Sequence, residues 1–134
     1  MALLRDASLG FAAGCLGGLV NSLGLWLAAS AGLLAALGVK IAPALTPAWL
    51  YPRVVWGGLW GLLFLLPSLG RGNWLAAGLA ASLGPTLVQL FYVFPVMAHK
   101  GTAGLELGLL TPLVVVLANA LWGWAAALWL RAIR

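Results

Sequence analysis

The sequence predicts an all-α polytopic membrane protein, a bundle of four transmembrane helices. Hydrophobic residues make up 64% of the chain and charged residues only 7%, whereas a water-soluble domain carries about 25% charged residues. The charged residues leave four long apolar intervals, which are 7–39, 54–70, 72–98 and 107–130. Because a helix needs roughly 20 apolar residues to cross the hydrocarbon, each interval predicts one span of a single transmembrane domain, 1–134.

The spans are predicted in order at about 8–30, 51–69, 74–95 and 108–130. The second interval is short, so we expect its helix to recruit Trp49–Pro52, with Arg53 extending its guanidinium to the interface.

Three connections join these spans. The longest, Ala31–Ala48, either extends the first helix or lies along the membrane surface as a short amphipathic piece. The turn Gly70-Arg71-Gly72-Asn73 predicts that the second and third spans form an antiparallel hairpin. The loop Pro95–Glu106 holds the clustered ionisable groups of the chain.

An even number of spans places both termini on one side of the membrane. That side carries Arg5, Arg71, Arg131 and Arg134, and the other carries Lys40, Arg53 and Lys100. The excess of basic residues favours cytoplasmic termini. The basic residues are isolated from one another and form no stripe along a phosphate backbone, so we expect membrane lipids as partners and no nucleic acid.

Small residues recur every fourth position along the first span and reappear in the others. The helix-packing set is Gly10, Gly14, Gly18, Ser22, Gly57, Gly61 and Gly123. In lipid, helices associate through close backbone approach rather than hydrophobic collapse. We therefore expect this stripe to pack helices within the chain or, alternatively, to face a partner subunit.

Four polar side chains lie near the middle of the predicted spans, namely Asn21, Thr86, Gln89 and Asn119. A carboxamide that faces lipid is costly, so these groups should turn inward and hydrogen-bond one another or a ligand. They are either interhelical contacts or the lining of a polar site.

A second polar set maps to the face opposite the termini, and consists of Arg53, His99, Lys100 and Glu106. It predicts an interfacial ion pair of Glu106 with a basic residue, or else a head-group site. His99 has no second histidine beside it, and Cys15 is the single cysteine. No metal site and no cofactor are therefore expected.

Enzyme signals are nearly absent. Asp6 and Glu106, the two carboxylates, fall on opposite faces and cannot form an acid–base pair. No Ser-His-Asp arrangement or phosphate-binding loop is present, so we expect no catalytic residues.

Five motifs of the chain are distinctive, namely TPAWLYPRVVWGGLWG at 46–61, PTLVQL at 85–90, Phe94-Pro95, His99-Lys100-Gly101 and NALWG at 119–123. In these motifs the chain resembles a group of small bacterial membrane proteins of unassigned function. His99 stands where that group usually has glycine. The resemblance implies a multi-pass protein of the bacterial inner membrane and implies no activity.

Three functions remain open. In the first, the protein is a non-enzymatic, homo-oligomeric bundle that forms a permeation or transport path lined by Asn21, Gln89 and Asn119. Alternatively, it is an accessory or assembly subunit of a larger membrane complex. The third alternative is a lipid- or pigment-binding bundle that uses Trp56 and Trp60, which lie one turn apart.

Overall fold

A computed structural model describes residues 1–69 and 72–134. These residues form helices and connecting turns and contain no β-strand, as the sequence predicts. The α-helices are α1 (Ala2–Ser30), α2 (Leu33–Ala36), α3 (Pro47–Gly61), α4 (Trp74–Val88) and α5 (Thr111–Ile133). Shorter 3₁₀ segments are η1 (Leu62–Leu65), η2 (Pro67–Leu69) and η4 (Thr102–Leu107), and η3 (Gln89–Met97) is a π-helix that continues α4.

Three helices of the described part are long and apolar enough to cross a bilayer. They are Ala2–Ser30, Trp74–Met97, which joins α4 to η3, and Thr111–Ile133. The predicted spans 8–30, 74–95 and 108–130 therefore correspond to helices whose ends differ from prediction by several residues.

The predicted span 51–69 does not correspond to one continuous helix. Helix α3 begins earlier, because the Thr46 hydroxyl caps it by accepting from the Trp49 amide and Pro47 occupies its first turn. The helix passes into η1 and then breaks at Leu66, whose backbone is extended. A residue before proline is driven out of the helical region, and Pro67 follows Leu66.

The connection 31–48 neither extends α1 nor forms an amphipathic helix of any length. Gly32, with φ 84°, ends α1 in a left-handed conformation. A single turn, α2, and an extended segment follow, with Leu34 and Val39 buried against Val114 of α5. The predicted turn at 70–73 lies partly outside the described residues, since residues 70 and 71 are not described.

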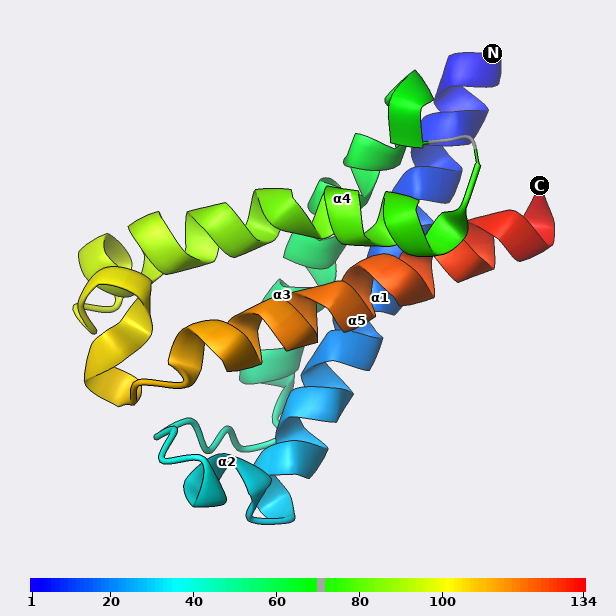
Figure 1. Cartoon of the computed structure of the whole chain (residues 1–134). Helices are drawn as coiled ribbons and strands as arrows, with labels where there is room; N and C mark the ends of the chain where they lie inside the picture. Colours follow the sequence, from blue (N-terminus) through cyan, green and yellow to red (C-terminus); the bar gives the residue numbers. More distant parts are fainter. Residues whose placement is uncertain (70–71) are drawn as a thin grey trace.

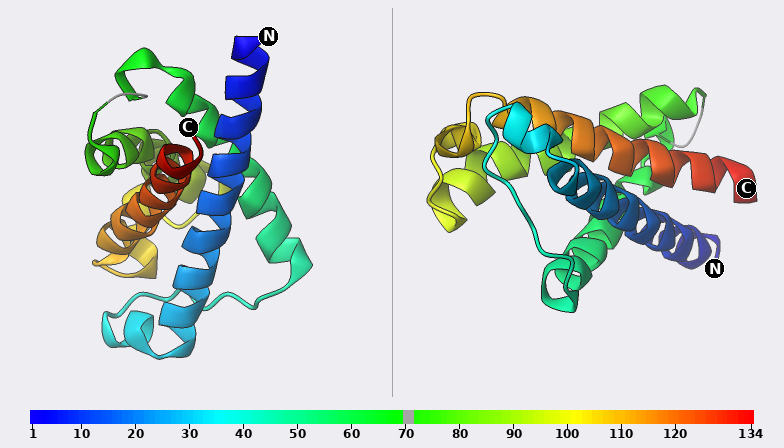
Figure 2. Two further views of the ribbon diagram at one scale, coloured as in Figure 1. Left: turned by 90° about the vertical axis from the view of Figure 1, so that its right-hand side faces the viewer. Right: turned by 90° about the horizontal axis from the view of Figure 1, so that it is seen from below.

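Two antiparallel helix pairs cross in the middle of the molecule (Figure 1). In the first pair, Gly10 of α1 lies against Gly61 of α3, and Gly18 lies against the Arg53 carbonyl. In the second, α4 and α5 approach where Gly78 meets Gly123. Figure 2 shows the two termini at one end of the molecule, and α2 and η4 at the other.

Backbone meets backbone at both helix pairs. A Cβ added at Gly14 would overlap the Gly57 carbonyl and lie 2.8 Å from Gly61 Cα, and one added at Gly123 would overlap the Gly78 carbonyl, so neither pair of helices has room for a side chain at these points. The stripe of Gly10, Gly14, Gly18 and Ser22 is buried in α1 and faces α3. The stripe thus packs α1 against α3 within the chain.

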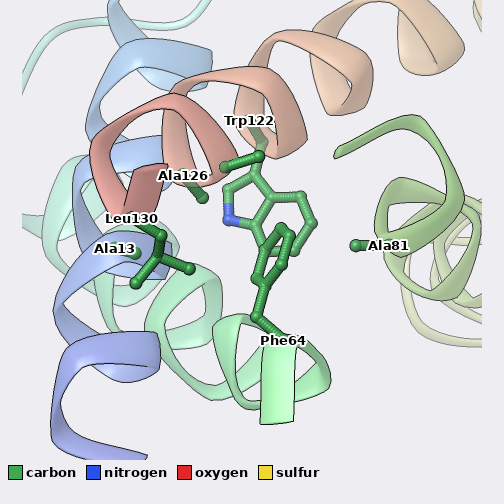
Figure 3. Packing of buried hydrophobic residues seen from close by; sticks show 7 residues of the cluster. Ala13, Phe64, Ala81, Trp122, Ala126 and Leu130 are labelled. Carbon is green, nitrogen blue, oxygen red and sulfur yellow. The ribbon is translucent and has the colours of Figure 1, made fainter. Parts of the chain in front are cut away.

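The apolar core fills the crossing near the end that carries the termini. Phe64 and Trp122 pack with ring centroids 6.1 Å apart, beside Ala13, Ala81 and Leu130 (Figure 3). The Trp122 indole N–H donates to the carbonyls of Gly14 at 3.1 Å and Gly57 at 3.3 Å. A single side chain thus joins α5 to both helices of the other pair.

Candidate functional site

A partly open cleft of about 380 Å³ lies between α3 and η3, above a floor formed by α1 and α5. Its walls carry Trp56 and Trp60 from α3, and Tyr92 and Met97 from η3. Trp56, Tyr92 and Met97 are more than half exposed, so they form its rim. Its polar lining consists of Asn21, Ser22, Arg53, Gln89 and Asn119. We refer to it as the Arg53 cleft.

Arg53 is held at the floor of this cleft by side chains of α1. Its Nε–H donates to Ser22 Oγ at 2.9 Å, and an Nη2–H donates to Asn21 Oδ1 at 2.7 Å. The Trp49 ring, one turn earlier in α3, lies 4.8 Å from the Arg53 guanidinium carbon and stacks on it. One hydroxyl acceptor and one amide acceptor of α1 thus hold the Arg53 guanidinium against the bundle.

The four polar residues predicted near mid-span join into one hydrogen-bonded chain. Asn21 Nδ2 donates to Asn119 Oδ1 at 3.1 Å and to the Ala118 carbonyl at 2.8 Å. Asn119 Nδ2 donates to Thr86 Oγ1 at 3.0 Å and approaches Gln89 Oε1 at 3.4 Å. Because Arg53 binds Asn21, the chain of contacts runs from the guanidinium across the floor to the opposite wall.

The guanidinium has no carboxylate partner in the part of the chain that the structure describes. The one salt bridge among residues 1–69 and 72–134 joins Arg5 to Asp6, and Glu106, the other acidic residue, is exposed. Arginine has five N–H donors, and the protein accepts from two of them here. The cleft therefore combines a positive charge with spare hydrogen-bond donors.

The second predicted polar set is not assembled. His99, Lys100 and Glu106 are exposed in the turn between η3 and α5, and no ion pair of Glu106 is formed among the described residues. The turn instead folds on its own backbone, since the Lys100 amide donates to Phe94 O and the Glu106 amide to Lys100 O. Among the described residues, the predicted ion pair of Glu106 with a basic residue is therefore not formed, and Arg53 is engaged by α1.

Sequence reasoning missed part of the cleft. Trp49 was expected only as part of the segment that lengthens the second span, yet it stacks on Arg53. Tyr92 was not singled out, although it follows Gln89 by three residues and so shares its helical face. Trp56 and Trp60, expected in the lipid- or pigment-binding alternative, both line the cleft.

The cleft is closed toward the termini. A Cβ added at Gly84 of α4 would lie 3.1 Å from both the Trp60 ring of α3 and the Leu63 side chain of η1, which shows that α3 and η1 touch α4 at this level. Beyond that contact lies the Phe64–Trp122 core. A second hollow of about 240 Å³, lined in part by Trp74, Arg131 and Arg134, lies on the far side of this core.

Comparisons with protein-family models, with curated proteins and with solved structures gave no match. The functional conclusion therefore follows from the chemistry of the cleft.

Proposed function

We propose that this protein is a small, non-enzymatic membrane protein that binds an anionic ligand in the Arg53 cleft. The observation that carries the proposal is the Arg53 guanidinium, which lies at the floor of the cleft without a carboxylate partner in the described chain. An arginine within the hydrocarbon is costly, by up to about 2.5–3.5 kcal/mol on insertion scales. A bound anion offsets that cost, and Asn21 and Ser22 position the guanidinium to receive it.

The proposed topology has four spans, with α3 and η1 together as the second. Residues 47–65 form one run of helical turns, about 28 Å long at about 1.5 Å per residue. This length suits the hydrocarbon thickness, and α3 runs antiparallel to the spanning helix α1. The bacterial inner membrane and cytoplasmic termini remain part of the proposal, supported by the basic residues near both ends and by the two termini lying at one end of the fold.

A binding site fits the geometry better than an open pore within one chain. The polar groups of the cleft end where Trp60 meets Gly84, and buried apolar side chains fill the space between the two hollows. A solute bound at Arg53 therefore has no continuous polar path to the other end of the bundle.

Binding can be measured with the purified protein in a non-ionic detergent. Tryptophan emission is recorded while inorganic phosphate or decanoate is added, because Trp56 and Trp60 line the cleft. We expect saturable binding of at least one anion, weakened about ten- to a hundredfold in Arg53→Gln, since a charge-assisted hydrogen bond contributes about 1.5–3 kcal/mol.

Lys40→Gln is the matched control, because it removes an exposed positive charge outside the cleft. It should bind like the unmodified protein. Absence of saturable binding by both anions, or equal binding by Arg53→Gln, would refute the proposed function.

A further inference from the structure

We infer that the anion is the head group of a membrane lipid whose acyl chain fills the cleft, rather than a free ion from water. The inference rests on the proposed binding of an anion by Arg53 and specifies the class of ligand. Two independent features carry it: the depth at which Arg53 lies and the apolar walls beside it.

Arg53 lies on the side of the bilayer away from the termini in the proposed topology. It is six residues beyond Pro47, the first residue of α3, and therefore about 9 Å along the helix. With Pro47 at the edge of the hydrocarbon, Arg53 lies about 9 Å inside that edge. A guanidinium at this depth draws the nearby bilayer surface inward through local thinning, and the nearest head groups are those at the Pro47 end.

The walls become apolar on moving from Arg53 toward the closed end. Trp56 and Trp60 follow Arg53 by three and seven residues, so they extend along one face of α3 for about 10 Å. Pro85 and Val88 line the other wall at that level. The cleft is thus polar at Arg53 and apolar beyond it, the same order of groups as in a lipid.

The open side of the cleft faces the hydrocarbon in the proposed topology. Trp56 is 62% exposed and Tyr92 53% exposed, and both stand on walls formed by membrane helices. A hollow open to lipid fills with acyl chains by default, because leaving it empty would forfeit van der Waals contacts. A hydrated ion would instead lose its water beside these apolar walls. Among the lipids that can fill the cleft, Arg53 then selects those with a negative head group.

Quenching by brominated lipids tests this selection directly. The whole protein is placed in phosphatidylcholine bilayers that contain a small fraction of lipid with brominated acyl chains, either phosphatidylglycerol or phosphatidylcholine. Bromine quenches tryptophan emission on contact. Quenching greater than the fraction of brominated lipid in the bilayer would produce by chance therefore reports a brominated lipid beside Trp56 and Trp60. We expect brominated phosphatidylglycerol to reach half of its selective quenching at a mole fraction about ten- to a hundredfold lower than brominated phosphatidylcholine does.

Two variants should remove this preference by different routes. Arg53→Gln deletes the charge, and Gln89→Glu places a carboxylate on the facing wall while keeping an oxygen that can accept from Asn119. Gln89→Glu leaves both Arg53 hydrogen bonds in place, so it remains informative if Arg53→Gln fails to fold. Trp56→Phe should reduce the selective component of quenching, and Lys40→Gln should keep the preference unchanged.

Equal quenching by the two brominated lipids, or an undiminished preference in Gln89→Glu, would overturn the inference. If inorganic phosphate binds in an Arg53-dependent manner while the lipids show no preference, the proposed function stands and the lipid assignment fails. If neither phosphate, decanoate nor lipid binding depends on Arg53, both fail together.

Discussion

Replacing Gly14 with alanine tests the closest approach between α1 and α3. The new Cβ would lie 2.8 Å from Gly61 Cα and 2.9 Å from Gly61 N, and would overlap the Gly57 carbonyl. Carbon atoms in good contact are about 3.5–4.0 Å apart, so the two backbones must separate by about 1 Å. The atoms that block the methyl group belong to the backbone and cannot rotate away.

The expected loss of stability has two parts. Overpacking of this kind costs about 1–3 kcal/mol. Separating α1 from α3 also lengthens the hydrogen bonds that Trp122 donates to the Gly14 and Gly57 carbonyls, at about 1 kcal/mol. We therefore expect Gly14→Ala to lower the free energy of unfolding by about 2–4 kcal/mol relative to a matched glycine-to-alanine change elsewhere in α1.

Gly24→Ala supplies that matched change. A Cβ at Gly24 would meet only the Leu121 side chain, at 3.5 Å, an ordinary contact. Alanine favours a helix over glycine by about 1 kcal/mol at both sites, so this term cancels when the variants are compared. Unfolding is followed by tryptophan emission as dodecyl sulfate is added to mixed micelles. If Gly14→Ala and Gly24→Ala unfold at the same detergent fraction, the reasoning about backbone contact is wrong.

Three further outcomes follow from named contacts. Asn119→Leu removes the centre of the polar chain and should lower stability in the same detergent titration by about 1–2 kcal/mol; an unchanged midpoint would contradict the hydrogen-bonded floor. Thr46→Ala removes the cap of α3 and should cost about 1 kcal/mol, seen as faster hydrogen exchange of the first amides of that helix; unchanged exchange would show that the cap is not used. In a Cys15→Ala background, Lys40→Cys and Lys100→Cys should both react with an impermeant maleimide from the side opposite the termini, and labelling from opposite sides would exclude four spans.

The long apolar helices were predictable because their signal is local. Charged side chains are excluded from hydrocarbon, so the intervals between them bound the helices. The ends of α3 were misplaced since they depend on single residues, the Thr46 cap and the break before Pro67. These signals are visible in the sequence but were outweighed by the length of the apolar interval.

The polar floor was partly predictable. Asn21, Thr86, Gln89 and Asn119 stand at similar depths, and an amide in lipid needs a partner, so their inward orientation follows from the sequence alone. The position of Arg53 does not, because the residues that hold it, Asn21 and Ser22, are 32 and 31 positions away in the chain. An arginine that extends to the interface and one that turns inward have the same sequence neighbours.

The sequence by itself determined that the chain is helical and apolar enough for a membrane, and that its polar groups must find one another. Only the tertiary structure decided which helices are in contact and where they diverge. Helix α3 and η1 meet α4 where Trp60 and Leu63 lie against Gly84, and the cleft occupies the space between α3 and η3 beyond that contact. The physical reason is that hydropathy acts on each segment separately, whereas a cleft is created by the crossing of segments, which depends on backbone contacts between glycines distant in the chain.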